Sequence, residues 1–203
     1  MKVSKIVKYG AARSKVLFDE GLALVFYNGE LRKYGISEGT ELSGELYHGS
    51  IVPALVRRAE ERLVYILKNS DKPEAELRRK LKEGCYPQEV IDEAISWAKS
   101  RHYIDDRRYA DNYIRYHASG KSRKQLLFAL QGKGIRKETA ELLLEEAEID
   151  ESAEIAAELR KKGYDPESPE AQDRKKTEKI AASLLRKGFS FEAVRHAMRL
   201  TDG

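Results

Sequence analysis

The segment LLFALQGKGIRKE, residues 126–138, contains the pattern that decides the fold. Leu126 and Leu130 are four residues apart, which places both side chains on one face of a helix. Gly134 follows, and a glycine there ends a helix because it adopts the left-handed conformation without strain. The next apolar residue tucks under the helix, and Glu138 lies in the first turn of a second helix, where the helix dipole favours a carboxylate. The segment therefore predicts two helices joined by a tight turn.

The same pattern occurs twice more in the chain without an internal gap. LRRKLKEGCYPQE, residues 77–89, precedes it by 49 residues, and IAASLLRKGFSFE, residues 180–192, follows it by 54. Gly84, Gly134 and Gly188 each fall one or two residues before the aligned apolar residue. Self-similarity at such a period is typical of a helical repeat protein.

Each copy requires a further helix to complete a bundle, and apolar residues at helical spacing precede every copy. These residues are Leu63, Ile66 and Leu67, then Tyr109, Ala110, Tyr113, Ile114 and His117, and finally Ile155, Ala156 and Leu159. We predict a mainly all-α fold of tandem three-helix modules over residues 54–104, 105–149 and 150–203. Repeat modules contact mainly their neighbours, which favours an elongated, curved array.

Helix-capping residues and prolines indicate where these segments are joined. Asp105 and Asp106 stand where a helix cap belongs and mark the joint between the first two modules. Residues 163–173, which include Pro166 and Pro169, predict a loop inside the third module.

The first 53 residues differ from the rest and predict a small β-meander extension with a linker. The β-rich runs are Lys5–Tyr9, Val16–Phe18 and Leu22–Tyr27. Asn28-Gly29 predicts a turn. A short helix is expected at Leu31–Tyr34, stopped by Gly35 and Gly39.

Composition indicates a protein of a reducing compartment. Charged residues make up 35%, and the single cysteine, Cys85, cannot form an internal disulfide. No long apolar stretch follows the N-terminal lysines, so neither a signal peptide nor a membrane span is expected, and cytoplasm is the predicted location.

The net charge is only +4, but the charges are segregated. Residues 112–137 hold seven Lys and Arg and no acid, whereas 138–158 hold nine acids and no Lys or Arg. Residues 174–199 hold eight Lys and Arg against two acids. Such blocks create local fields that steer polyelectrolyte partners, although solvated helix faces explain them equally well.

Catalytic, metal and nucleotide sites are not indicated. Capping explains Asp105 and Asp106, and Cys85 has no nearby base. Gly120-Lys121-Ser122 lacks the earlier glycine of a P-loop, because position 115 is arginine. His48, His102, His117 and His196 lack ligand spacing. We predict a protein that is not an enzyme and uses neither metal nor cofactor. Tyr109, Tyr113 and Tyr116 favour core packing over base stacking.

Residues 101–135, RHYIDDRRYADNYIRYHASGKSRKQLLFALQGKGI, resemble the core signature of the RecX family. PEAELRRKLKEGCYPQEVIDEAI from Pro73 resembles the family's first module, and ASLLRKGFSFEAV from Ala182 its third. The β-rich start and ISEGTEL at 36–42 are similar to the N-terminal extension of some members. Each motif alone is weak, but three in order at this spacing are specific. One departure is Gly84-Cys85, where the other copies have Lys-Gly.

The resemblance implies a monomeric regulator that lodges in the groove of the filament of RecA recombinase on single-stranded DNA. There it restrains recombinase, ATPase and co-protease activities; direct contact with single- or double-stranded DNA stays open. The alternative is a general nucleic-acid-binding helical repeat protein with no RecA link.

The candidate partner-contacting residues are cations on the predicted helices. Lys121, Arg123 and Lys124 also lie at a helix start, where backbone donors could hold a phosphate. The full candidate set is Arg78, Arg79, Lys80, Lys82, Arg107, Arg108, Arg115, Lys121, Arg123, Lys124, Lys133, Arg174, Lys175, Lys176 and Lys179.

Overall fold

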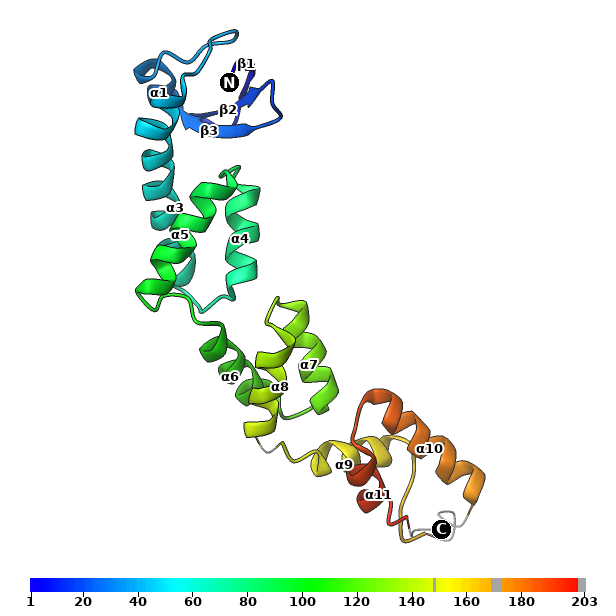
Figure 1. Ribbon diagram of the computed structural model, residues 1–203. Coiled ribbons are helices and arrows are strands. Elements are labelled where there is room, and N and C mark those ends of the chain that lie inside the picture. The colour runs from blue at the N-terminus through cyan, green and yellow to red at the C-terminus, as the bar shows by residue number, and fades with distance from the viewer. Residues whose placement is uncertain (148, 169–172, 201–203) are drawn as a thin grey trace. The chain divides into compact units, whose positions relative to one another are not determined.

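The computed structural model describes residues 1–147, 149–168 and 173–200 (Figure 1). The chain divides into two compact units, Met1–Asp105 and Asp106–Gly203. The described residues form a mainly helical protein with a small N-terminal antiparallel sheet, as the repeat and the β-rich start predict.

The sheet is a meander of three antiparallel strands in the order β1-β2-β3. Its strands are β1 (Val3–Lys8), β2 (Arg13–Phe18) and β3 (Ala23–Tyr27). Side chains on one face alternate into the interior, and the fully buried ones include Val16, Leu24 and Phe26. The predicted β-meander is confirmed, with β2 starting three residues before the predicted run.

The predicted turn at Asn28-Gly29 is wrong, because these residues begin helix α1 (Asn28–Lys33). The Glu30 carboxylate accepts a hydrogen bond from the Tyr27 backbone N–H at 2.8 Å, which caps the helix start. An Asn-Gly pair forms a hairpin turn only where a strand returns along the sheet. Here the chain instead passes Gly35, at φ +63°, and buries Ile36.

The first module begins inside one long helical segment. It consists of α2 (Gly44–Leu46), a π-helical turn η1 (Tyr47–Ile51) and α3 (Val52–Leu67). After it come α4 (Glu74–Glu83) and α5 (Gln88–Ser100), and α5 packs on both α3 and α4. One apolar core joins the sheet to this module, since buried strand and helix residues form a single cluster.

The second unit contains two three-helix modules. The helices of the first are α6 (Asp106–His117), α7 (Arg123–Gly132) and α8 (Lys137–Glu146). Those of the second are α9 (Ser152–Lys161), α10 (Arg174–Lys187) and α11 (Phe191–Ala197). Each of these two modules has an apolar core of its own.

The repeated apolar positions are interior in all three modules. Leu77, Leu81, Leu126, Leu130 and Leu184 are fully buried, and Ile180 is 8% exposed. The aligned glutamates, Glu89, Glu138 and Glu192, lie in the first turns of α5, α8 and α11. The alignment therefore identified equivalent positions correctly.

The helix-ending turn differs in the first copy. Gly134 and Gly188 adopt left-handed φ angles of 85° and 91°, as predicted. In the first copy the left-handed residue is Cys85, at φ +59°, and not Gly84. The turn residue is the one directly before the aligned apolar residue, and Cys85 holds that place before the partly buried Tyr86. Gly84 is small for another reason, because a Cβ there would lie 3.0 Å from Cε2 of Tyr86.

The predicted helix start at Asp105-Asp106 and the predicted loop in the third module agree with the structure for the residues that it describes. Helix α6 starts at Asp106, so Asp105 directly precedes it. Gly163, at φ +61°, and Pro166 lie in the loop between α9 and α10, whereas Pro169 lies outside the described residues. Among the described helices, every one is too short or too polar to cross a bilayer.

Candidate partner-binding surface

Two lysines of the basic block, Lys121 and Lys133, lie close to one ring, Tyr113 of α6. The Lys121 ammonium donates a hydrogen bond to the Tyr113 hydroxyl at 3.1 Å and lies 5.2 Å from the ring centroid. The Lys133 ammonium lies 5.1 Å from the same centroid, and the His117 ring lies 4.2 Å away, centroid to centroid. Cations are attracted to the face of an aromatic ring. Lys121 and Lys133 therefore form one cationic patch around the ring, although they are twelve positions apart in the sequence.

The tyrosine stripe of α6 is interior only in part. Tyr109 and Tyr113 are half-buried against the module's core, as predicted. Tyr116 is 83% exposed, so the prediction of core packing is wrong for this residue. Two residues turn a helix by about 200°, which places Tyr116 opposite the buried Ile114.

Three backbone donors at the start of α7, the N–H groups of Ser122, Arg123 and Gln125, already have partners within the chain. The buried Ser122 hydroxyl accepts from the Gln125 N–H at 3.2 Å, and the Gln125 side chain accepts from the Ser122 N–H at 2.9 Å. The Arg123 N–H donates to a Glu151 oxygen at 2.7 Å. A carboxylate of the chain itself thus occupies the place considered for a phosphate. What this helix start presents to a partner is side-chain charge.

Glu151 also joins the second and third modules. Its other carboxylate oxygen accepts from the Ser190 N–H at 3.1 Å, so one side chain caps both α7 and α11. The Ser122 hydroxyl donates to the Lys187 carbonyl at 2.9 Å. A Cβ at Gly188 would lie 2.5 Å from Cβ of Lys124, so the glycine permits this close approach.

Sequence reasoning missed Glu151, because it considered the acidic block only as a source of local field or as solvated helix faces, and not as a source of helix caps. Its side chain is 8% exposed, in contrast to a solvated carboxylate. The sequence offers Ser122 and Ser190 as helix caps close to the two N–H groups that Glu151 accepts from. A capping serine shows where a helix begins, but it does not show that a distant carboxylate also binds there.

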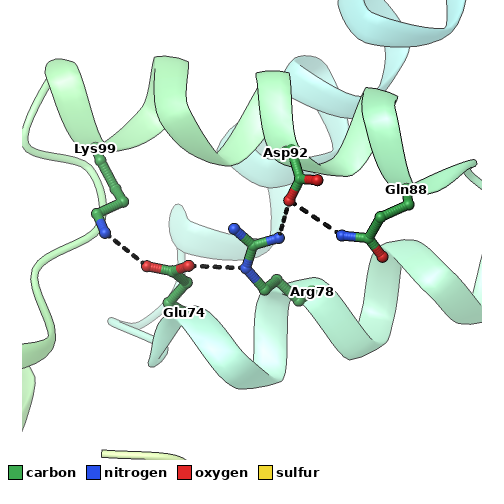
Figure 2. Close-up of polar contacts among 5 residues, drawn as sticks. All are labelled: Glu74, Arg78, Gln88, Asp92 and Lys99. Atoms are coloured by element: carbon green, nitrogen blue, oxygen red, sulfur yellow. Dashed lines mark hydrogen bonds and ion pairs between the residues drawn. The ribbon is translucent and has the colours of Figure 1, made fainter. Parts of the chain in front are cut away.

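The candidate Arg78 is bound within a network of hydrogen bonds and ion pairs in the first module (Figure 2). Arg78 donates from Nε to Glu74 at 2.7 Å and from Nη1 to Asp92 at 2.5 Å. Glu74 also accepts from Lys99 at 2.8 Å, and Asp92 from Gln88 at 3.0 Å. These contacts connect α4 to α5, so Arg78 is engaged inside its module.

The network shifts the ionisation of its members. Burial raises the pKa of Glu74, but hydrogen bonds from Lys99 and Arg78 outweigh burial and hold that pKa below its usual value. Hydrogen bonds from Arg78 and Gln88 lower the pKa of Asp92. Burial lowers the pKa of Arg78, yet its two carboxylate partners produce a net increase.

Most other candidates also have partners within the chain. The ion pairs are Arg79–Glu83 at 2.7 Å, Lys80–Glu76 at 3.8 Å, Arg107–Glu146 at 2.9 Å, Arg115–Asp111 at 2.9 Å, Arg123–Glu145 at 3.9 Å and Arg174–Glu178 at 2.8 Å. Arg108 and Lys176 interact within the chain as well. Exposed pairs of this kind are weak and exchange readily for an external anion.

Four candidates keep exposed side chains without an ion pair inside the described part of the chain. We call them the unpaired lysines: Lys82, Lys124, Lys175 and Lys179. Lys124 lies on α7, and Lys175 and Lys179 lie one turn apart on α10, so three of the four belong to the second unit. Lys82 of α4 belongs to the first unit.

Metal ligation finds no support among the described residues, since no group of three or more His, Cys, Asp or Glu side chains could hold an ion there. The free thiol of Cys85 is partly exposed.

The modules and their basic helices define a tandem three-helix repeat protein. Family models of the first, second and third three-helix domains of RecX match residues 59–97, 105–144 and 150–198. The chain belongs to the RecX family, which confirms the predicted resemblance.

Curated relatives described as regulatory protein RecX support this assignment. The protein from Actinobacillus pleuropneumoniae serotype 5b (strain L20) is 33% identical over 137 residues, which are 67% of this chain and 87% of that relative. The protein from Geobacillus kaustophilus (strain HTA426) is 28% identical over 175 residues. That match covers 85% of this chain and 64% of the relative, so the chain spans less than two thirds of that relative's length.

Solved structures share the fold. A crystal structure of a regulatory protein RecX aligns with a TM-score of 0.62 at 22% identity and covers 98% of both chains. RecX from Lactobacillus salivarius aligns with a TM-score of 0.60 at 22% identity, over 72% of this chain and 96% of that one.

Proposed function

We propose that this chain binds the filament that RecA recombinase forms on single-stranded DNA, lies in its groove, and restrains recombinase, ATPase and co-protease activities. The observation that carries the proposal is the match of all three modules, in order, to a family of regulatory proteins. The role expected for this chain is therefore contact with a larger assembly.

The charge distribution supports an anionic partner. Lys124, Lys175 and Lys179 project from the second unit without an internal carboxylate among the described residues. A lysine that already has a carboxylate partner must break that pair before it binds a phosphate or an acidic side chain, whereas these three need not. We therefore assign the main partner contact to these lysines, together with the patch of Lys121 and Lys133, which flanks Lys124 in sequence.

The function is tested by ATP hydrolysis and strand exchange of RecA on single-stranded DNA, with this protein added well below the RecA concentration. Inhibition at such levels is expected for a protein that acts on a filament. Binding to DNA without any effect on RecA would instead indicate a general nucleic-acid-binding repeat protein.

The contact surface is tested with a charge-reversed variant, Lys124→Glu/Lys175→Glu/Lys179→Glu. It should inhibit RecA about tenfold less well, and the log–log salt slope should fall in magnitude by roughly 0.7 for each single-strand phosphate that the variant no longer binds. The matched control is Arg136→Glu/Lys162→Glu/Arg186→Glu, which changes the same charge at three other exposed positions of the unit. Equal weakening in both variants would show that only net charge matters.

Reversal at Lys121 or Arg123 is a poorer test. Lys121 donates to Tyr113, and the Arg123 side chain pairs with Glu145 at 3.9 Å. Weaker binding there could therefore arise from altered packing.

We further infer that the protein acts in the cytoplasm as a monomer and without catalysis. The single cysteine and the segregated charges are compatible with this. Sedimentation at the concentrations of the inhibition assay tests the oligomeric state.

A further inference from the structure

A cleft of about 570 Å³ opens in the first unit, between the hairpin side of the sheet and helices α3 and α4. Its walls include Tyr9, Arg13, Tyr27, Arg62, Lys80 and Tyr86. The volume lies in the usual range of ligand sites. None of the RecX family models covers the strands that form one wall.

Guanidinium groups and tyrosine rings are paired along this cleft. The Arg13 Cζ atom lies 5.6 Å from the Tyr9 ring centroid, and the Arg58 Cζ atom lies 4.6 Å from that of Tyr27. Tyr9 is 39% exposed and Tyr27 is 45% exposed, so both rings retain accessible surface. Aromatic faces next to cations offer stacking and charge in one place.

The cations of the cleft are only partly neutralised. Four cations, Arg13, Arg58, Arg62 and Lys80, and two carboxylates, Glu61 and Glu83, line the cleft, and Lys80 pairs with Glu76 at 3.8 Å. Glu83 is engaged by Arg79 at 2.7 Å, outside the cleft. Arg13 and Arg62 form no ion pair within the part of the chain that the structure describes.

Arg58 has a structural role and is set apart from the other two arginines. It bonds the Val25 carbonyl at 3.0 Å and pairs with Glu30, which fastens α3 to the sheet and α1. Tyr86 also lines the cleft, and burial raises its pKa although the charges of Arg58, Arg62 and Arg13 act in the opposite direction. Arg13 and Arg62 are thus the two guanidinium groups of the cleft that form no ion pair among the described residues.

We propose that this cleft binds an unpaired nucleic-acid strand, with a base on the Tyr9 ring and phosphates at Arg13 and Arg62. An acidic peptide would use the cations but would leave the exposed rings without a partner. A nucleotide strand uses both, because every base has a face that stacks and every linkage carries a negative charge. The site rests on the proposed function, since the strand would be the DNA of the filament.

The charge part is tested with a labelled thymidine oligonucleotide and the full chain, by fluorescence anisotropy and without RecA. Arg13→Glu/Arg62→Glu should weaken binding about tenfold and should reduce the salt slope by roughly 0.7 for each phosphate that the variant no longer binds. The control Lys5→Glu/Lys68→Glu makes the same charge change at exposed positions outside the cleft and should bind nearly as the unaltered chain does. Equal binding by the two variants would overturn the proposal.

The stacking part is tested with Tyr9→Leu and an abasic strand of equal length. The variant should bind the thymidine strand about tenfold more weakly and should bind the abasic strand as the unaltered chain does. If the unaltered chain binds both strands equally, or if a polyglutamate peptide displaces the thymidine strand with equal affinity, the cleft is a general anion site and the proposal fails.

Folding and the proposed function are controlled separately. Fluorescence of Trp97, the only tryptophan of the chain, reports on the first unit and should be unchanged in each variant. Because the oligonucleotide assay contains no RecA, a negative result in it would refute strand binding by the cleft without contradicting the inhibition of RecA. Conversely, absence of RecA inhibition leaves the oligonucleotide comparison interpretable.

Discussion

Two joints between parts of this chain are held together by different kinds of interaction, one by apolar packing and the other mainly by hydrogen bonds. The sheet and the first module share one apolar core, in which Phe26 of β3 and Leu63 of α3 are both fully buried. The second and third modules have separate cores, and hydrogen bonds around Glu151 connect them. An apolar joint distributes its stability over many contacts, whereas a polar joint depends on a few directional hydrogen bonds, here those of Glu151 and Ser122.

The difference implies different cooperativity in the two units. Burial of apolar surface is non-directional and roughly proportional to area, so elements that share a core unfold together. Hydrogen-bonded modules with separate cores behave more like repeats, each with its own stability plus an interface term. We expect the sheet and first module to unfold as one unit, and the second and third modules to unfold together only while the hydrogen bonds between them hold.

The largest expected effect comes from truncation at equivalent core positions, Leu81→Ala in the first unit and Leu130→Ala in the second. Both leucines are fully buried, and such a change costs about 2–5 kcal/mol. Leu81→Ala should lower amide protection in the sheet as well as in the first module and should shift the Trp97 unfolding transition. Leu130→Ala should lower protection mainly within residues 105–149 and leave Trp97 unaffected.

Amide exchange along the chain measures both outcomes and also tests the predicted module boundaries at 53/54, 104/105 and 149/150. Reduced protection over the whole chain in either variant would mean a single cooperative unit. A sheet that keeps its protection in Leu81→Ala would contradict the shared core.

A smaller effect is expected from Glu151→Ala, which removes the acceptor of the Arg123 and Ser190 N–H groups. Each buried donor left without a partner costs about 1–3 kcal/mol, less where water reaches it. Amide exchange at Arg123 and Ser190 should accelerate, and the second and third modules should melt in separate calorimetric transitions.

The matched control is Glu178→Ala, which removes a carboxylate that is 63% exposed and pairs with Arg174 within one helix. It should have little effect. If both glutamate variants melt alike, the joint does not depend on the Glu151 carboxylate.

The smallest expected effect is a loss of unfolding free energy of the first unit at acid pH, when Glu74 becomes protonated. The pKa of Glu74 is lower in the folded chain than its usual value of 4.5, so the carboxylate stabilises the fold fully above that value. This contribution disappears as the pH falls through the lower folded-state pKa. Since partly exposed ion pairs are weak, the change should be about 1 kcal/mol or less.

Urea unfolding followed by Trp97 at neutral and acid pH measures this effect, with Glu74→Gln as the comparison. The variant should lose less stability on acidification than the unaltered chain does. An identical pH dependence in the two proteins would show that the network in Figure 2 contributes nothing measurable to the first unit.

Local pattern predicted the helices and most of their interior positions, and it erred where a turn signal fell at a helix start and where a residue lay at the edge of a helix face. Leu77 and Leu126 were predicted to occupy equivalent interior positions, and both are buried because the equivalent helix buries the same face in each bundle. Asn28-Gly29 begins a helix because Glu30 caps it and no strand returns. Tyr116 is exposed because the buried stripe of α6 runs through Ala110 and Ile114.

The amino-acid sequence alone was sufficient for the family, the three modules, the β-meander and the basic helices, because these depend on residue spacing along one element. Which cations remain without a carboxylate, the double cap formed by Glu151, and the cleft that brings Arg13 of β2 near Arg62 of α3 came only from the folded chain. These features join residues far apart in sequence, and their distances are set by how separate elements pack, which no local periodicity encodes.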